Sequence, residues 1–427
     1  MDQVRVSLEK LQNPNCLIIV PFQKFNISAQ MAEYKSKEAF GLARSIDLNV
    51  IDVITFRVNS FKPGCLLKKG KIEEIDSVIK KEDISLVYID LSLTPVQQRN
   101  LEKAWNVKVI DRTGLIIEIF ASRANTSEGK LQVRLAQLDY QKSRLVRLWT
   151  HLERQRGGLG NIGGPGETQI EADKRMIKEE MQRIRKQLEK VKTTRELHRK
   201  SREIVPYPVI AIVGYTNAGK STLFNLLTKA SVIAEDKLFA TLDPTMRIVK
   251  LPSRKTVILS DTVGFISELP TQLIAAFRAT LEEVIAADII LHVIDSTSPS
   301  LVNHIQNVEE ILTELGIEEK WRYQTLHVYN KMDAKKIDFI KPIDGLEISA
   351  LENKNIDLLL QQLDACLAVD EINMEITIKS NEGEKLAWIY RHANVISVEH
   401  ADLEIKLLVL ISRVNLAKWQ AKYVLPS

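Results

Sequence analysis

A glycine-containing loop between an apolar strand and an amphipathic helix constrains this chain more than any other feature. Within VIAIVGYTNAGKSTLFNLLTKA (209–230), residues 214–221 match the pattern G-x-x-x-x-G-K-[ST] in full. The glycines let backbone N–H groups converge on phosphate groups at a helix N-terminus. The pattern therefore predicts a P-loop domain. Its phosphate-binding residues would be Gly214, Tyr215, Thr216, Asn217, Ala218, Gly219, Lys220 and Ser221.

A carboxylate that suits a magnesium site follows on a second apolar strand. TVILSDTVG places Asp261 at the strand end, where it would hold Mg²⁺ through water. We expect the Ser221 hydroxyl to bind the ion directly and Lys220 to neutralise the β- and γ-phosphates. Gly264 has no side chain to keep its N–H from a γ-phosphate. The second segment predicted to bind the nucleotide and Mg²⁺, after the P-loop, comprises Asp261, Thr262, Val263 and Gly264.

Two further strand ends predict that the base is guanine. In LHVYNKMD, the Asp333 carboxylate can accept hydrogen bonds from N1–H and N2–H₂ of guanine, and adenine has no such donor pair. Lys331 would lie over the base plane. A backbone N–H of GLEISAL can meet guanine O6. The predicted base-binding residues are Asn330, Lys331, Met332, Asp333, Ser349, Ala350 and Leu351. Together, the ordered motifs identify a GTP-binding domain.

The first switch of such a domain needs a threonine between the P-loop and Asp261, because its hydroxyl binds Mg²⁺. KLFATLDPT (237–245) offers both Thr241 and Thr245. The sequence of this segment alone does not show which of the two threonines is the Mg²⁺ ligand.

The rest of the chain is predicted to surround this domain with α/β and helical segments. Short apolar runs at 16–22, 50–56, 86–91 and 108–112 predict strands, and helical spacing lies between them at 27–46 and 71–82. Helical stretches at 131–156 and 167–203, on either side of the glycine-rich 157–166, predict a coiled-coil hairpin. The apolar stripe of its second helix would be Ile170, Met176, Ile177, Met181, Ile184, Leu188 and Val191.

We therefore expect an α/β protein of four parts. These are an N-terminal α/β domain (1–125), the glycine-rich loop and basic helical hairpin (126–204), the P-loop GTPase domain (205–368) and a small α+β C-terminal domain (369–427). We expect a core or capping position for His292 and core positions for Trp388 and Trp419.

Charge is distributed unevenly along the chain. Residues 1–203 hold 37 Lys and Arg against 26 Asp and Glu, whereas residues 204–370 hold 15 against 22. A basic first half favours a polyanionic partner. No apolar run approaches the roughly 18–20 residues that span a bilayer, and the first residues lack an apolar signal core. We expect a cytoplasmic monomer with no integral membrane association and no DNA partner. Peripheral association of part of the protein with a membrane is the alternative.

The motifs GYTNAGKSTLFN, FATLDPT, DTVGFI and NKMD resemble those of the HflX family of the Obg–HflX GTPases. VIDRTGLIIEIF, EGKLQVRLAQL and GGPGETQIEADKR extend the resemblance into the first half of the chain. The resemblance implies that Thr241 is the first-switch Mg²⁺ ligand and contributes to catalysis with Lys220. The first-switch segment would be Phe239, Ala240, Thr241, Leu242 and Asp243.

The resemblance also implies a function: GTP-gated binding to the large (50S) ribosomal subunit and its rRNA, with ribosome splitting or rescue. One departure concerns the glycine-rich loop, because family members usually carry an arginine before Gly-Pro-Gly and this chain has Ile162, Gly163 and Gly164 there. The alternative function is a GTPase switch with a protein or membrane-surface partner. Phe265 occupies the position where many switch GTPases carry a water-orienting glutamine, which predicts slow intrinsic hydrolysis.

Overall fold

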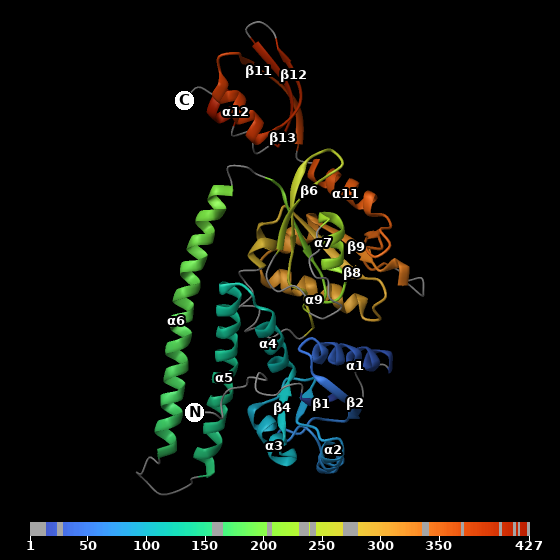
Figure 1. Ribbon diagram of the computed structural model, residues 1–427, viewed down its shortest axis with the longest axis vertical. Coiled ribbons are helices and arrows are strands. Elements are labelled where there is room, and N and C mark those ends of the chain that lie inside the picture. Colours follow the sequence, from blue (N-terminus) through green and yellow to red (C-terminus); the bar gives the residue numbers. More distant parts are fainter. Residues whose placement is uncertain are drawn as a thin grey trace.

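The described part of the chain forms three sheets and a long helical hairpin (Figure 1). The computed structural model describes residues 14–23, 29–155, 165–202, 207–229, 239, 245–267, 281–334, 341–368, 371–400, 404–412, 416 and 419–424. No helix in these ranges is long and apolar enough to cross a membrane. The predicted α/β fold class is confirmed, with its P-loop domain, helical hairpin and small C-terminal domain.

The N-terminal domain is a parallel sheet with strand order β2-β1-β3-β4. Apolar clusters cover both faces of this sheet, so β1, β3 and β4 are buried between the helices on each side, whereas the edge strand β2 is partly exposed. Its elements are β1 (Asn15–Gln23), α1 (Ala29–Arg44), β2 (Asn49–Val58), α2 (Lys69–Lys81), β3 (Leu86–Ile89), α3 (Pro95–Trp105), β4 (Lys108–Asp111) and α4 (Arg112–Arg123).

The fourth strand ends one residue earlier than predicted. Asp111 closes β4 and caps the next helix, because its carboxylate accepts a hydrogen bond from the Gly114 N–H at 2.8 Å. Arg112 is therefore the first residue of α4, and the prediction of a strand through Arg112 is wrong. This boundary places Arg112 at the carboxyl edge of the sheet.

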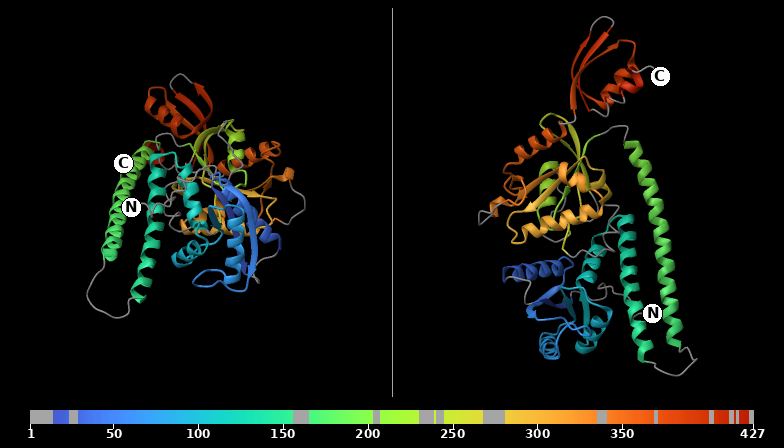
Figure 2. Two further views of the ribbon diagram at one scale, coloured as in Figure 1. Left: turned by 60° about the horizontal axis from the view of Figure 1, so that its bottom comes forward. Right: turned by 180° about the vertical axis from the view of Figure 1, so that it is seen from behind.

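The predicted hairpin consists of α5 (Ser127–Gln155) and α6 (Pro165–Arg202), which run side by side in Figures 1 and 2. Leu138 of α5 is buried against Met181 and Ile184 of α6. The predicted stripe is wrong at Met176, whose exposed fraction is 47%. Met176 and Ile177 are about 100° apart around the helix, so only one of them can face the partner, and Ile177 packs on the cluster.

The central domain contains a mixed sheet with strand order β10-β9-β8-β5-β7-β6, in which only β6 is antiparallel to its neighbour. Parallel strands direct their carboxyl ends to one edge, and this edge carries the predicted nucleotide motifs. The elements are β5 (Val209–Val213), α7 (Lys220–Thr228), β6 (Thr245–Lys250), β7 (Thr256–Asp261), β8 (Ile289–Asp295), α9 (Leu301–Glu314), α10 (Glu318–Tyr323), β9 (Thr325–Asn330), β10 (Leu346–Glu347) and α11 (Ile356–Ala368).

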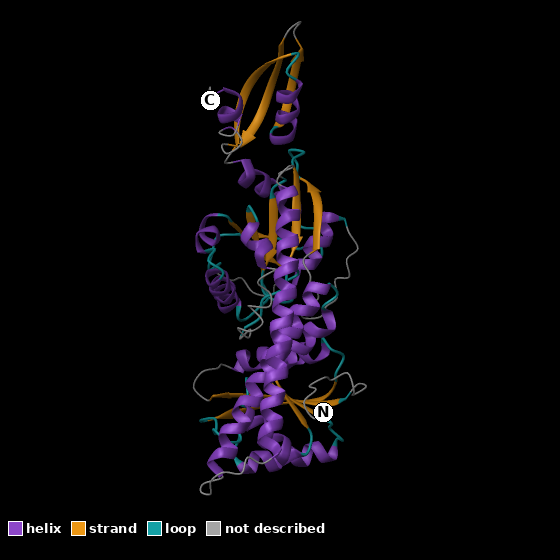
Figure 3. Ribbon diagram, turned by 90° about the vertical axis from the view of Figure 1, so that its left-hand side faces the viewer, coloured by secondary structure: helices purple, strands orange, loops and turns teal. Residues whose placement is uncertain are grey.

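The C-terminal domain is a small antiparallel sheet with a helix packed against one of its faces. It lies at the far end of the molecule from the N-terminal domain (Figure 3). Trp419 is 3% exposed and Trp388 packs against the same cluster, so both tryptophans belong to the core as predicted. The elements are β11 (Glu371–Lys379), α12 (Gly383–His392), β12 (Asn394–His400) and β13 (Glu404–Ser412).

A pair of histidines lies on the central sheet, one buried and the other half-buried. His292 of β8 is 1% exposed, as the prediction of a core position requires, and its Nδ1 lies 3.1 Å from His327 Nδ1 on β9. The Trp321 ring packs against both imidazoles. Burial lowers the pKa of His292 well below its usual value and lowers that of His327 to about 4. The folded domain therefore holds this pair in the neutral form.

Acidification should destabilise the domain through His327. Because its folded pKa lies below the ordinary 6.5, the unfolded state binds more protons between those values, and stability falls as pH falls through this window. We expect wild type to lose up to about 2 kcal/mol more than His327→Gln between pH 7 and pH 5. Urea denaturation at both pH values measures the difference. His400→Gln, an exposed position on β12, is the matched control; an equal pH dependence in wild type and His327→Gln would contradict the assignment.

Candidate functional site: a guanine-nucleotide pocket

The P-loop connects β5 to α7 at the carboxyl edge of the central sheet. Gly219 caps α7 with a φ of +90°, and a Cβ at this residue would lie 2.3 Å from Asn330 Nδ2. Any side chain here would therefore be strained by conformation and by collision. The glycine leaves the N-terminus of α7 open to a phosphate group.

Lys220 is buried at the start of α7, where its Nζ donates a hydrogen bond to the Tyr215 carbonyl oxygen at 2.8 Å. Burial lowers the pKa of Lys220 to about 8, and the nearby Asp261 carboxylate opposes this shift. A buried cation with little compensating charge is a favourable partner for a polyphosphate. The structure thus places the predicted phosphate lysine within the loop.

Ser221 and Asp261 come together from two different elements. The Ser221 hydroxyl donates to Asp261 Oδ2 at 2.8 Å, and the strand register pairs Asp261 of β7 with Ile212 of β5. A hydroxyl and a carboxylate next to a phosphate loop are the hard oxygen donors that Mg²⁺ prefers. These two residues fit a magnesium site, and the third predicted ligand, Thr241, lies outside the described residues.

The segment after Asp261 packs directly onto the P-loop. A Cβ at Gly264 would lie 2.8 Å from Lys220 Nζ and 3.1 Å from Thr216 Cα, so a side chain here would displace the lysine from its position in the loop. Backbone hydrogen bonds join Thr216 N–H to the Phe265 carbonyl at 2.7 Å and Phe265 N–H to the Gly214 carbonyl at 3.1 Å. Phe265 is 2% exposed, so its ring packs inside the protein.

Asn330 links the P-loop to the second base-binding loop. Its Nδ2 donates to the Ala218 carbonyl oxygen, and its Oδ1 accepts from the Ala350 N–H, both at 2.9 Å. The Ser349 hydroxyl donates to Asp333 Oδ1 at 2.5 Å and so orients the carboxylate that is predicted to read guanine. The structure thus brings together three motifs that lie far apart in the sequence.

Other predicted site residues have more distant positions. Phe239 is 2% exposed, and its ring centroid lies 4.6 Å from that of Phe120 in α4, so it packs against the N-terminal domain. The Leu351 side chain is 79% exposed. The remaining first-switch predictions, Ala240 to Asp243, lie outside the described residues.

Sequence reasoning missed a buried ionic network between the N-terminal domain and this pocket. The Arg112 guanidinium donates to Glu38 Oε1 and to Asp90 Oδ1 at 2.6 Å, and all three side chains are at most 6% exposed. Its Nη2 also donates to the Ser267 carbonyl oxygen at 3.1 Å, just beyond the segment that holds Gly264. The network therefore joins the sheet edge of one domain to the segment that follows Asp261 in the other.

Tyr215 of the P-loop joins the same contact. Its hydroxyl accepts a hydrogen bond from the Ser267 N–H at 2.8 Å and donates to Glu38 Oε1 at 3.3 Å. The Tyr215 ring stacks on His304 of α9 at 3.7 Å between centroids, and His304 Nε2 lies 3.0 Å from the Tyr34 hydroxyl of α1. The P-loop thus contacts the N-terminal domain directly.

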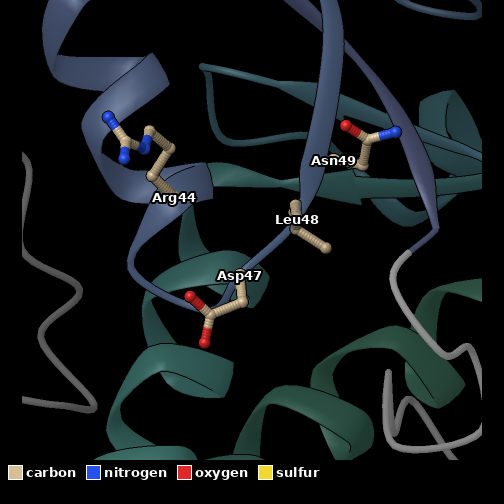
Figure 4. A pocket seen from close by; sticks show the side chains of 4 residues that line it. All are labelled: Arg44, Asp47, Leu48 and Asn49. Carbon is tan, nitrogen blue, oxygen red and sulfur yellow. The ribbon is translucent and has the colours of Figure 1, made fainter.

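A separate hollow lies at the other side of the N-terminal domain. It has a volume of about 390 Å³ and lies between the end of α1 and the start of β2, lined by Arg44, Asp47, Leu48 and Asn49 (Figure 4). These residues lie where β2 begins, at the amino edge of the N-terminal sheet, whereas Arg112 contacts the GTPase domain at the carboxyl edge, so this hollow is not part of the site.

Three models of known protein families match this chain along much of its length. Residues 33–121 match the GTP-binding GTPase N-terminal region, and residues 123–202 match the GTP-binding GTPase middle region. Residues 209–331 match the family described as 50S ribosome-binding GTPase.

Individual relatives cover nearly the whole chain. A protein named GTPase HflX from Magnetococcus marinus is 43% identical over 420 residues, which cover 97% of this chain and 96% of the relative. GTPase HflX from Escherichia coli is 43% identical over 363 residues, which cover 83% and 84% of the two chains. Among solved structures, a GTP-binding protein from Sulfolobus solfataricus in complex with GDP is 25% identical with a TM-score of 0.45, covering 82% of this chain and 98% of that one.

Proposed function

The chain belongs to the HflX family of GTPases, and we propose on this premise that its GTP-bound form binds the large ribosomal subunit and acts in splitting or rescuing ribosomes. The GTPase domain itself follows from the family. The proposal concerns what that domain controls.

In this proposal the P-loop holds the nucleotide and Mg²⁺. Lys220 binds the β- and γ-phosphates, Ser221 and Thr241 supply hydroxyl ligands, and Asp261 holds the ion through water. The ion, when bound, would neutralise charge that develops on the phosphate oxygens. The hydrogen bond between Ser221 and Asp261 supports this assignment, because it places both oxygens beside the loop.

We expect the isolated protein to hydrolyse GTP slowly. The side chain of Phe265 has no hydrogen-bonding group and is buried, so it cannot orient the attacking water. A partner surface would then supply the missing positioning. This makes the ribosomal subunit both the binding target and the stimulator of hydrolysis.

The basic hairpin is the proposed rRNA contact. Recognition of RNA helices depends largely on shape, phosphates and 2′-hydroxyls, for which Lys and Arg are suited. Exposed cations of α6 include Arg175, Lys178, Arg183, Arg185, Lys186 and Lys190. Because such binding releases counterions, affinity should fall steeply with salt.

One observation carries the gating part of the proposal. Arg112 contacts Ser267, which follows the segment Asp261 to Gly264 that would form the second switch, and the adjacent Asp111 accepts a hydrogen bond from Arg144 of α5 at 2.6 Å. Consecutive residues of the N-terminal domain therefore touch the GTPase switch and the basic hairpin. A conformational change in the switch on GTP binding would therefore alter the contact between Asp111 and Arg144, through which α5 of the hairpin is held.

GTP turnover with and without purified large subunits tests the proposal. We expect subunits to raise the turnover at least about tenfold and added salt to reduce the stimulation. The variant Arg183→Glu/Arg185→Glu/Lys186→Glu should lose most of the stimulation but keep the basal rate. Lys379→Glu/Lys406→Glu, which reverses charges on the C-terminal domain, is the control. Absence of stimulation by subunits would contradict the proposal and favour a protein or membrane-surface partner.

A further inference from the structure

An ion pair lies beside the base-binding motif. Lys331, the lysine of N-K-x-D, places its Nζ 2.9 Å from Asp295 Oδ2, and the two side chains are 30% and 19% exposed. Asp295 ends β8 and Asn330 ends β9, and the parallel register pairs these two residues directly. The pair therefore follows from the sheet itself, because neighbouring parallel strands end at the same edge.

The Asp295 carboxylate is held in a fixed orientation by the turn that follows it. Its Oδ1 accepts hydrogen bonds from the Thr297 N–H at 2.9 Å and from the Thr297 hydroxyl at 2.6 Å. This arrangement leaves Oδ2 for Lys331. The Ser296 N–H also donates to the Asn330 carbonyl oxygen at 3.1 Å, which ties the turn to the base-binding strand.

A fixed carboxylate changes what the lysine can do. A lysine side chain has a flexible four-carbon stem, and holding its ammonium group at one point restricts that stem. Lys331 also lies close enough to Lys220 that its charge adds to burial in lowering the Lys220 pKa. Asp295 therefore supplies Lys331 with a counter-charge as well as an anchor.

We propose that Asp295 is a positioning residue for base recognition, which fixes the Lys331 stem over the face of the guanine base. The inference deepens the predicted role of Asn330, Lys331 and Asp333 in guanine binding and rests on it. Asp333 would read the hydrogen-bonding edge of the base, whereas the Asp295–Lys331 pair would cover its face. The pair should thus contribute to purine-nucleotide affinity without contributing to discrimination at the exocyclic groups.

The nucleotide dissociation constant measures this role. Titration with fluorescently labelled GDP should show Asp295→Asn binding about 5- to 10-fold more weakly than wild type, with an equal fold-change for GTP analogues and for inosine diphosphate. The asparagine keeps an acceptor for Thr297 and removes only the charge. Asp357→Asn, an exposed aspartate of α11, is the matched control and should leave affinity unchanged.

A double-mutant cycle separates positioning from a general structural effect. In a Lys331→Met background, Asp295→Asn should change affinity less than about twofold, because its partner is already gone. Thermal melting of the nucleotide-free variants checks that each one folds. An unchanged affinity in Asp295→Asn, or a full effect that persists without Lys331, would overturn the inference. If wild type failed to bind guanine nucleotides, the predicted guanine-binding role itself would be wrong.

Discussion

Replacing Arg112 with methionine is expected to lower the free energy of unfolding by about 3–5 kcal/mol, since it leaves two buried carboxylates without their cation. Glu38 and Asp90 both contact the guanidinium at 2.6 Å. Burial already raises the pKa of Glu38, and Arg112 opposes this shift in wild type. Urea denaturation followed by circular dichroism measures the loss.

The pH dependence of this loss identifies its cause. Without Arg112, the folded-state pKa of Glu38, which burial already raises, should rise further, so stability is lost as pH rises and partly regained in acid. The neutral triple variant Arg112→Met/Glu38→Gln/Asp90→Asn should recover much of the stability. Arg134→Met, which breaks the exposed pair with Glu180, is the matched control and should cost less than about 1 kcal/mol. Equal losses in the two single variants would refute the network as a buried ionic contact.

Replacing Asp333 with asparagine is expected to weaken GDP and GTP binding at least about 100-fold, since the carboxylate would accept two hydrogen bonds from guanine. The asparagine amide can instead donate to the 2-oxo group of xanthine. We therefore expect the same variant to bind xanthosine diphosphate more tightly than wild type does. Competition against fluorescently labelled GDP measures both constants.

A nearby aspartate provides the control for this change. Asp344 is exposed in the loop before β10, and Asp344→Asn should keep the preference for guanine. Ser349→Ala removes the 2.5 Å hydrogen bond that orients Asp333 and should weaken GDP binding by a smaller factor, about tenfold. A variant Asp333→Asn that still prefers guanine would show that another residue reads the base.

The nucleotide pocket could be predicted from the sequence because each of its motifs follows an apolar strand. Parallel strands bring their ends to one sheet edge, so Lys220, Asp261 and Asn330 come together once the strands are recognised. The residue types also carry their own chemistry: a flexible glycine, a hydroxyl ligand and a carboxylate for guanine. The local sequence pattern and the strand topology were therefore sufficient to predict which residues meet at this sheet edge.

The interdomain contact could not be predicted in the same way. Glu38 and Tyr215 are 177 positions apart in the sequence, and no motif that contains one of them predicts a contact with the other. The apolar pattern predicts Arg112 at the end of a strand, although it begins a helix whose N-cap is Asp111. Its contacts depend on how two complete domains pack, and only the structure supplies that information. The same limit explains Asp295, whose partner Lys331 lies on the neighbouring strand.

Sedimentation of the protein with purified large ribosomal subunits, in a non-hydrolysable GTP analogue and in GDP, tests the central claim most directly. The account predicts co-sedimentation with the GTP analogue, little or none with GDP, and loss of the complex as salt rises. Binding of equal strength in both nucleotides, or no binding in either, would contradict a GTP-gated ribosome factor.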